Sequence, residues 1–114
     1  LGDISAAIEK RVRKAGYSPI ESLAGHGVGR ELHEYPAIPC FVSGDEVESL
    51  ELRKGCVFAI EVMYSQGSSE IEIDKDGWTL RLKDGKIGAL FEETVALTAS
   101  GPVALTPSNV AKAS

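Results

Sequence analysis

The apolar positions follow a helical period near the start of the chain and a strand period later. Residues 3–15 carry apolar side chains at spacings of three and four, which predicts a helix with one apolar face. That face consists of Ile4, Ala7, Ile8, Val12 and Ala15. Asp3 is placed to cap the start of this helix, and Gly16 to end it in a left-handed conformation.

The second half of the chain has the pattern of β-strands. Residues 57–64 are apolar and rich in β-forming residues, interrupted only by Glu61. The further predicted strands cover residues 71–73, 78–82 and 87–98. A helix followed by such strands favours an α+β fold, with the helix packed on an antiparallel sheet, over a parallel α/β fold.

The segment between the helix and these strands has no regular period. Residues 23–30 are too rich in glycine for a stable helix and predict a loop, and Pro36 and Pro39 bracket an extended segment. Residues 43–56 are polar and predict a surface loop or a short helix. We expect one ordered unit over residues 1–106 and a flexible tail over 107–114.

The composition is that of one globular domain and excludes several classes of protein. The 114 residues are 43% hydrophobic and 25% charged, which argues against disorder. A net charge of -5, with the basic cluster confined to the end of the predicted helix, argues against a nucleic-acid binder. No apolar run approaches the roughly 18 residues that a membrane span needs. Cys40 and Cys56 form no CxxC pair, which favours a reducing compartment, so we expect a cytoplasmic protein.

Both histidines lie in the stretch GHGVGRELHE, as His26 and His33. Histidine is the commonest metal ligand and a common acid–base group, and the glycines beside His26 leave its side chain uncrowded. From these residues alone, the alternative is a glycine turn with two partly exposed histidines that have no special role.

Three glutamates interrupt the predicted strands. Glu61 lies within VFAIEVMY, where a buried carboxylate would need a partner, a proton or a metal ion, unless the strand turns this side chain to water. Glu92 and Glu93 point to opposite faces of their strand, and alternation alone does not choose between them. If the strands of Glu61 and Glu92 are neighbours, both carboxylates can converge with His26. One nitrogen and two carboxylates suit Zn, Mn, Fe or Co better than Ca.

Several stretches together resemble the C-terminal half of a type I methionine aminopeptidase. They are GHGVGRELHEYPAIP, LRKGCVFAIEVM, DGWTLRLKDGKIGALFEETVALT and SGPVALT, which cover nearly all of residues 25–106. The GHGxG and HE-x-P motifs are shared across the wider pita-bread fold family, whereas the segment from DGWT to FEET is more specific to methionine aminopeptidases. The resemblance implies half of a pita-bread fold, with residues 1–106 as the C-terminal half of a catalytic domain. The implied activity is removal of N-terminal methionine from peptides or nascent proteins.

The same resemblance implies roles for individual residues. His26, Glu61 and Glu92 match metal ligands, with Glu92 as the bridge between two divalent ions (Co, Mn, Fe or Zn) and Glu61 also as a proton shuttle. His33 matches a catalytic group that contacts the substrate and polarises its carbonyl. The residues that match the methionine pocket are Leu32 and Trp78.

The chain departs from the family pattern in three respects. Val62 stands where the family usually has proline, and Glu93 replaces the histidine of FEHT. Two aspartate ligands and another histidine of the family's site belong to the other half. We therefore expect little or no activity from this chain alone, and we expect it to dimerise, to swap segments or to pair with that half. The start at Leu1 fits the same expectation.

Two alternative functions stay open at this point. An Xaa-Pro aminopeptidase or prolidase would share GHGxG and HE-x-P, but usually ends with an RxE stretch in place of DGWT and FEET. A non-catalytic binding module on the pita-bread fold would typically lose metal ligands, whereas this chain keeps three.

Overall fold

The helix predicted near the start is present as α1 (Gly2–Lys14) in the computed structural model, which describes residues 1–107. Asp3 is not the N-cap as predicted; the helix begins one residue earlier, so Leu1 takes that position and Asp3 lies in the first turn. An acidic residue in the first turn still interacts favourably with the helix dipole. The predicted end is confirmed, because Gly16 follows the last turn with a φ of 84°.

The side of α1 that packs on the sheet is narrower than predicted. Leu1, Ser5 and Val12 are buried, whereas Ala7 and Ala15 are exposed, contrary to the expected apolar face. Ala15 lies past the last residue of the helix, as its C-cap. The basic cluster is exposed to solvent, as its place at the end of the helix predicts.

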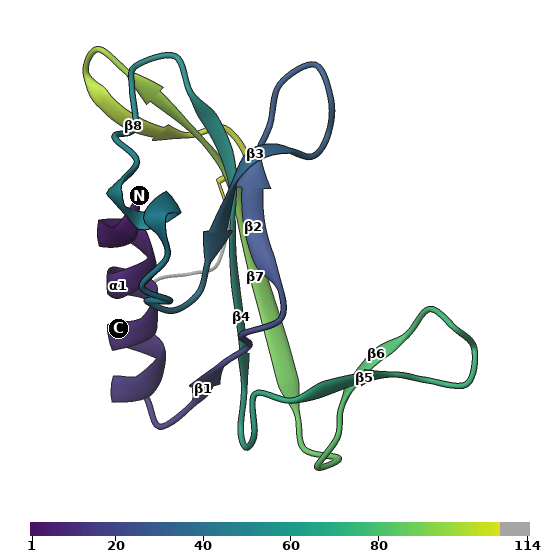
Figure 1. The fold of residues 1–114 in the computed structure, drawn as a ribbon. Coiled ribbons are helices and arrows are strands. Elements are labelled where there is room, and N and C mark those ends of the chain that lie inside the picture. The colour runs from purple at the N-terminus through teal and green to yellow at the C-terminus, as the bar shows by residue number, and fades with distance from the viewer. Residues whose placement is uncertain (108–114) are drawn as a thin grey trace.

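The rest of the described chain forms one antiparallel sheet and a separate hairpin (Figure 1). The main sheet has the order β3-β2-β4-β7-β8, with β1 paired to the far end of β4, and the hairpin joins β5 to β6. The strands are β1 (Ser18–Pro19), β2 (Ala24–Gly27), β3 (Glu34–Pro39), β4 (Val57–Ser65), β5 (Ile71–Ile73), β6 (Leu80–Leu82), β7 (Gly88–Thr98) and β8 (Gly101–Ala104), with a short 3₁₀ helix at Glu46–Ser49. The α+β class is therefore confirmed.

The glycine-rich stretch forms part of the sheet and is not wholly a loop as predicted. Its first half is β2, which lies between β3 and β4. Glycine is required here by close backbone approach: a Cβ added at Gly25 would collide with the carbonyl oxygen of Ala59, and one added at Gly27 with that of Tyr35. The glycines therefore let β2 lie close against its neighbours with His26 between them.

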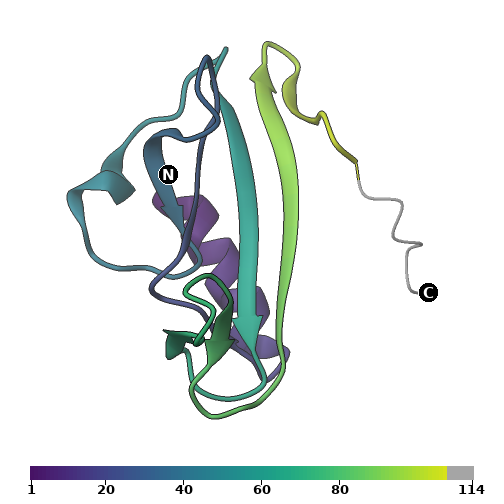
Figure 2. The same ribbon diagram turned by 90° about the vertical axis from the view of Figure 1, so that its right-hand side faces the viewer.

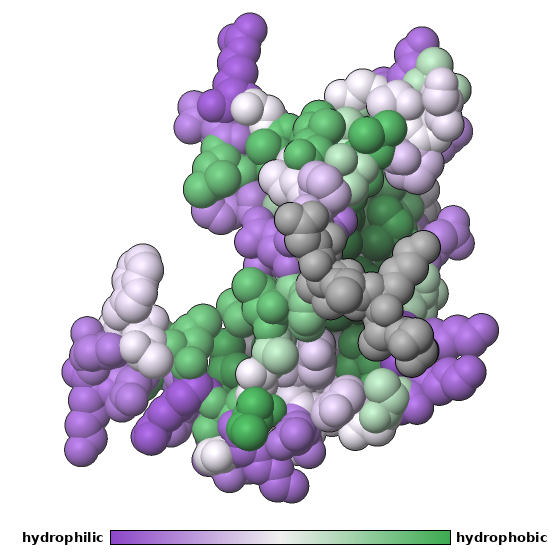
Figure 3. Space-filling view, turned by 180° about the vertical axis from the view of Figure 1, so that it is seen from behind, coloured by the Kyte–Doolittle hydropathy of each residue, from purple (hydrophilic) through white to green (hydrophobic). Residues whose placement is uncertain are grey.

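The two faces of the sheet have different surroundings (Figures 1 and 2). Helix α1 packs against part of one face, where Phe58 of β4 clusters with Leu1 and Ile38. On the other face, Met63 of β4 clusters with Leu82 of the hairpin. The β2–β3 loop and the β5–β6 hairpin both project on this second side, and Figure 3 shows the hollow between the two projections. We call this second side the open face.

The β5–β6 hairpin differs in one detail from the prediction. The strand expected over residues 78–82 begins only at Leu80, because Asp76 holds the preceding turn. Its carboxylate accepts hydrogen bonds from the backbone N–H groups of Trp78 and Thr79 at 2.9 and 2.8 Å. Trp78 therefore lies in the hairpin loop.

Two of the expectations concern the chain as a whole. The predicted tail, apart from Pro107, lies outside the described residues. Within residues 1–107, no helix has the length and apolar character to cross a membrane.

Replacing Gly25 with alanine is expected to lower the free energy of unfolding by about 1–3 kcal/mol, because the new methyl group meets a backbone oxygen that cannot move aside. Gly29→Ala is the matched control, since the Cβ there meets only the flexible end of the Glu34 side chain and should cost less. Urea unfolding of both variants measures the difference. Equal stability of Gly25→Ala and the parent chain would contradict the close approach of β2 and β4.

Candidate metal centre

Three adjacent strands bring one histidine and two glutamates to the open face. His26 of β2 lies opposite Ala59 of β4, and Glu61 lies opposite Glu92 of β7. Side chains directly opposite each other, and those two residues apart on a strand, share a face. His26, Glu61 and Glu92 therefore lie on the same side of the sheet as Met63. The candidate ligand atoms of His26, Glu61 and Glu92 all lie within 4.8 Å of one another.

The imidazole of His26 is oriented for binding through Nε2. Its Nδ1 lies 2.8 Å from the carbonyl oxygen of Gly27, so the Nδ1 proton is donated to that oxygen. In the neutral ring the lone pair is then on Nε2, which lies 3.5 Å from the Oε1 atom of Glu61. A backbone carbonyl that orients a histidine in this way is a common feature of metal sites.

The electrostatics of the cluster favour a cation. Burial raises the pKa of Glu61, and the nearby carboxylate of Glu92 raises it further, while His26 and His33 act in the opposite direction. Two carboxylates directly opposite each other on neighbouring strands repel one another. A divalent ion held by the two carboxylates would offset that repulsion and would accept the Nε2 lone pair, so these three residues fit a metal ion.

His33 lies beside this cluster, in the loop that follows β2. Its ring centroid is 4.2 Å from that of His26, with an angle of 47° between the rings. The loop is tied to the start of β3, because the Glu31 N–H donates to the Glu34 carboxylate at 3.0 Å. The structure thus brings together four of the six predicted site residues: His26, His33, Glu61 and Glu92.

The two residues expected to line a methionine pocket lie apart from the sheet. Leu32 is in the β2–β3 loop and Trp78 in the loop of the β5–β6 hairpin, and these are the two projections that flank the open face. Their side chains are 70% and 87% exposed, respectively. The described residues therefore do not enclose either of them.

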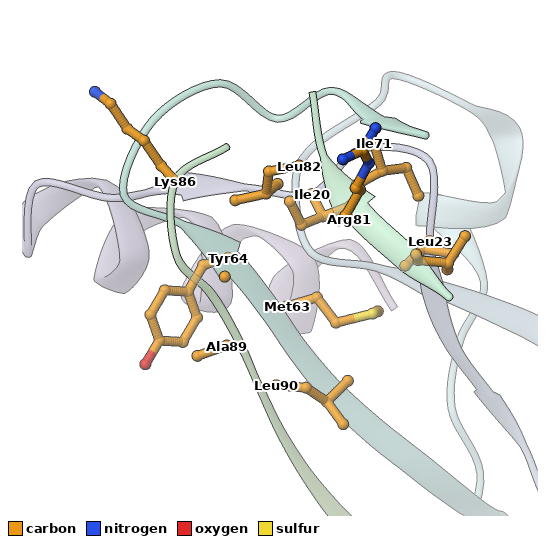
Figure 4. Close-up of a pocket in the computed structure, with 12 residues that line it drawn as sticks. Ile20, Leu23, Met63, Tyr64, Ile71, Arg81, Leu82, Lys86, Ala89 and Leu90 are labelled. Carbon is orange, nitrogen blue, oxygen red and sulfur yellow. The ribbon is translucent and has the colours of Figure 1, made fainter. Parts of the chain in front are cut away.

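An apolar cavity next to the cluster was missed by the sequence analysis. Met63 and Leu90 pair with each other two residues beyond Glu61 and Glu92, on the same face. They line a cavity of about 430 Å³ together with Leu82 of the hairpin (Figure 4). In the sequence, the signal for Met63 and Leu90 was their position two residues from Glu61 and Glu92, which places them on the same face of each strand.

Both departures from the family motifs within β4 and β7 face away from the cluster. Val62 follows Glu61 directly, and Glu93 lies opposite Ile60, so their side chains belong to the face that carries α1. The two replacements therefore leave the set of convergent ligands unchanged.

Comparisons with known proteins agree on one family. A model of metallopeptidase family M24 matches residues 1–99. The methionine aminopeptidase of Aquifex aeolicus is 46% identical over 106 residues, which are 93% of this chain and 41% of that protein. The methionine aminopeptidase of Escherichia coli strain K12 is 39% identical over 93% of this chain and 39% of its own length.

Solved structures of methionine aminopeptidases are also similar to this chain. The crystal structure of methionine aminopeptidase from Thermotoga maritima matches with a TM-score of 0.85 and 42% identity, over 94% of this chain and 42% of that one. The corresponding enzyme from Rickettsia prowazekii gives a TM-score of 0.84 and 34% identity, over 93% and 42% of the two chains. The chain thus spans about two fifths of the length of these relatives.

Replacing Glu92 with glutamine is expected to raise the free energy of unfolding by about 0.2–1 kcal/mol in the presence of a chelator, because the like charge opposite Glu61 is removed. Glu93→Gln is the matched control, because its side chain lies on the other face and its replacement leaves both carboxylates of the Glu61–Glu92 pair in place. Urea unfolding in EDTA at pH 8 compares the two variants with the parent chain. A loss of stability in Glu92→Gln would contradict the repulsion between the two carboxylates.

Proposed function

This chain belongs to metallopeptidase family M24, and we propose that it is the metal-binding portion of a methionine aminopeptidase that removes N-terminal methionine from peptides and nascent proteins. The α+β fold that the motifs predict, half of a pita-bread fold, agrees with the solved methionine aminopeptidases. The observation that carries the proposal is the convergence of His26, Glu61 and Glu92 from three adjacent strands.

Each member of the cluster has a distinct part in the proposed reaction. His26 would bind through Nε2, and the Glu61 and Glu92 carboxylates would bind through their oxygens, with Glu92 as the bridge between two ions. A bound divalent ion supplies Lewis acidity, which lowers the pKa of a water molecule and polarises the peptide carbonyl. Glu61 would also act as the proton shuttle that the resemblance implies, holding a proton between two steps of the reaction.

His33 would act on the substrate. Its ring lies against that of His26 and is exposed on the open face, so a ring N–H can reach the carbonyl oxygen of a peptide held there. A preorganised donor at this place contributes roughly 3 kcal/mol to the stabilisation of the developing negative charge.

The side chain of the first substrate residue would lie on the same face. The cavity lined by Met63 and Leu90 begins two residues from the two glutamates and is apolar, as methionine requires. Leu32 and Trp78 would close over this region from the two projections. This arrangement would select an unbranched apolar side chain.

The remainder of the site would come from a longer protein. The chain spans about two fifths of its relatives, and we propose that two aspartate ligands are supplied by the other half of the fold. Exposed apolar residues on both faces of β7 and on β8 support this, because Leu90, Phe91 and Val103 are 52%, 50% and 45% exposed. In the absence of that half, these surfaces would favour pairing or segment swapping between two copies.

The choice of metal and the location also belong to the proposal. The ligand set fits Co, Mn, Fe or Zn and does not choose among them. Both cysteines are free thiols, which suits the cytoplasm. A non-catalytic binding module would have no need of three convergent ligands.

The 114-residue chain is expected to bind a divalent ion through His26, Glu61 and Glu92. Calorimetric titration with Mn²⁺ should show binding heat in the parent chain and in Glu93→Ala, and none in His26→Ala, which lacks the nitrogen ligand. Absence of heat above buffer in a folded parent chain would end the proposal for this cluster.

In the full-length protein, Glu92→Ala is expected to abolish release of methionine from a Met-Ala-Ser peptide, because the bridging carboxylate is lost. Glu93→Ala, the change at the neighbouring glutamate of the opposite face, should retain activity. Near-normal turnover by Glu92→Ala would reject the assignment.

A further inference from the structure

The edge of β4 that carries Glu61 is paired in two separate segments. Strand β2 pairs with Phe58 and Ala59, and β1 pairs with Tyr64 and Ser65. Residues 60–63 lie between these two segments and have no register partner on that side. The N–H of Ile20, just after β1, donates to the carbonyl oxygen of Met63 at 2.9 Å, so the gap is confined to the Glu61 carbonyl and the Met63 N–H. The backbone of a metal ligand therefore lies at a break in the pairing of this edge.

The thiol of Cys40 occupies this break. Cys40 directly follows β3 and is fully buried. Its Sγ lies 3.1 Å from the carbonyl oxygen of Glu61, to which the thiol donates, and 3.4 Å from the N–H of Met63, from which it accepts. One side chain thus supplies the donor and the acceptor that an adjoining strand would have offered.

The chain has a second free cysteine that lies outside this arrangement. Cys56, the other cysteine, is only half-buried and lies in the separate cluster around Phe58. The two cysteines therefore offer a matched comparison within one chain.

We propose that Cys40 is a positioning residue for the metal site, holding the backbone of Glu61 so that its carboxylate meets His26 and Glu92. The inference rests on the proposed metal-binding function of that cluster. On its other edge, β4 is fixed by β7 through the Glu61–Glu92 pair. With Cys40 in place, both edges of β4 are held at the ligand. Without it, one buried and one partly buried backbone group lose their partner, and the strand must shift or admit water.

Packing alone would give a different pattern of mutational effects. Cys40 also belongs to an apolar cluster with Ile20, Met63 and Leu82. If only packing mattered, Cys40→Val would behave like the parent chain, and Cys40→Ser would be the damaging change. If the hydrogen bonds matter, the order is reversed, because serine keeps a donor and an acceptor and valine has neither.

Two measurements on the 114-residue chain test the proposal. Mn²⁺ affinity by calorimetry is expected to fall about tenfold in Cys40→Val, the range of losses for groups that orient metal ligands, and to be retained in Cys40→Ser. Hydrogen exchange of the Met63 amide without metal should be slow in the parent chain and in Cys40→Ser, and faster in Cys40→Val. Cys56→Val and Cys56→Ser should change neither quantity.

The proposal is overturned if Cys40→Val keeps the Mn²⁺ affinity of the parent, or if Cys40→Ser loses as much as Cys40→Val. Should Cys40→Val not fold, exchange at Met63 in the parent and in Cys40→Ser decides, and a rapidly exchanging amide in the folded parent refutes the bridge. A parent chain that binds no Mn²⁺ but protects the Met63 amide overturns the proposed function and leaves the hydrogen-bonded bridge supported.

Discussion

The pairing of β4 with β7 places two glutamates directly opposite each other, and the arrangement of the site depends on this register. Glu61 and Glu92 face the same side of the sheet, next to His26 on the third strand. A shift of one residue would turn one carboxylate to the α1 side and leave the other alone. Like charges so close are unfavourable by themselves, so the register is best understood as a site prepared for a cation.

The surrounding structure holds the three candidate ligands in place. Glycines at 25 and 27 let β2 approach its neighbours, so that the ring of His26 comes within reach of Glu61. The carbonyl of Gly27 holds the Nδ1 proton and leaves Nε2 free to bind. We infer that the Cys40 thiol holds the backbone of Glu61 in position through its hydrogen bond to the carbonyl oxygen. Each of these contacts acts on the position of one ligand.

The long periodic elements and the strands of the β5–β6 hairpin could be predicted from the sequence, whereas the other short or closely packed strands could not. Helix α1 and strands β4 and β7 have apolar patterns that run over many residues. Strands β5 and β6 have only three residues each, but apolar and charged residues alternate in both. Strands β1 and β8 have two and four residues and show no such alternation. Strand β2 reads AGHG, which has little intrinsic preference for a strand; its conformation depends on neighbours that are distant in the sequence.

The same limit applies to the site. His26, Glu61 and the Glu92–Glu93 pair stand out in the sequence by residue type, but alternation alone could not say which glutamate meets Glu61. That choice follows from the resemblance to methionine aminopeptidases, and the pairing of Glu61 with Glu92 in the sheet agrees with it. Cys40 could not have been found at all, since its contacts with β4 arise only in the folded chain.

The most direct test of this account is a crystal structure of the chain grown with Mn²⁺, with the ion located by its anomalous scattering. The account predicts a peak on the open face, within coordination distance of Nε2 of His26 and of oxygens of Glu61 and Glu92. A folded chain with Mn²⁺ bound only at other carboxylates, or with these three side chains turned away from one another, would contradict it.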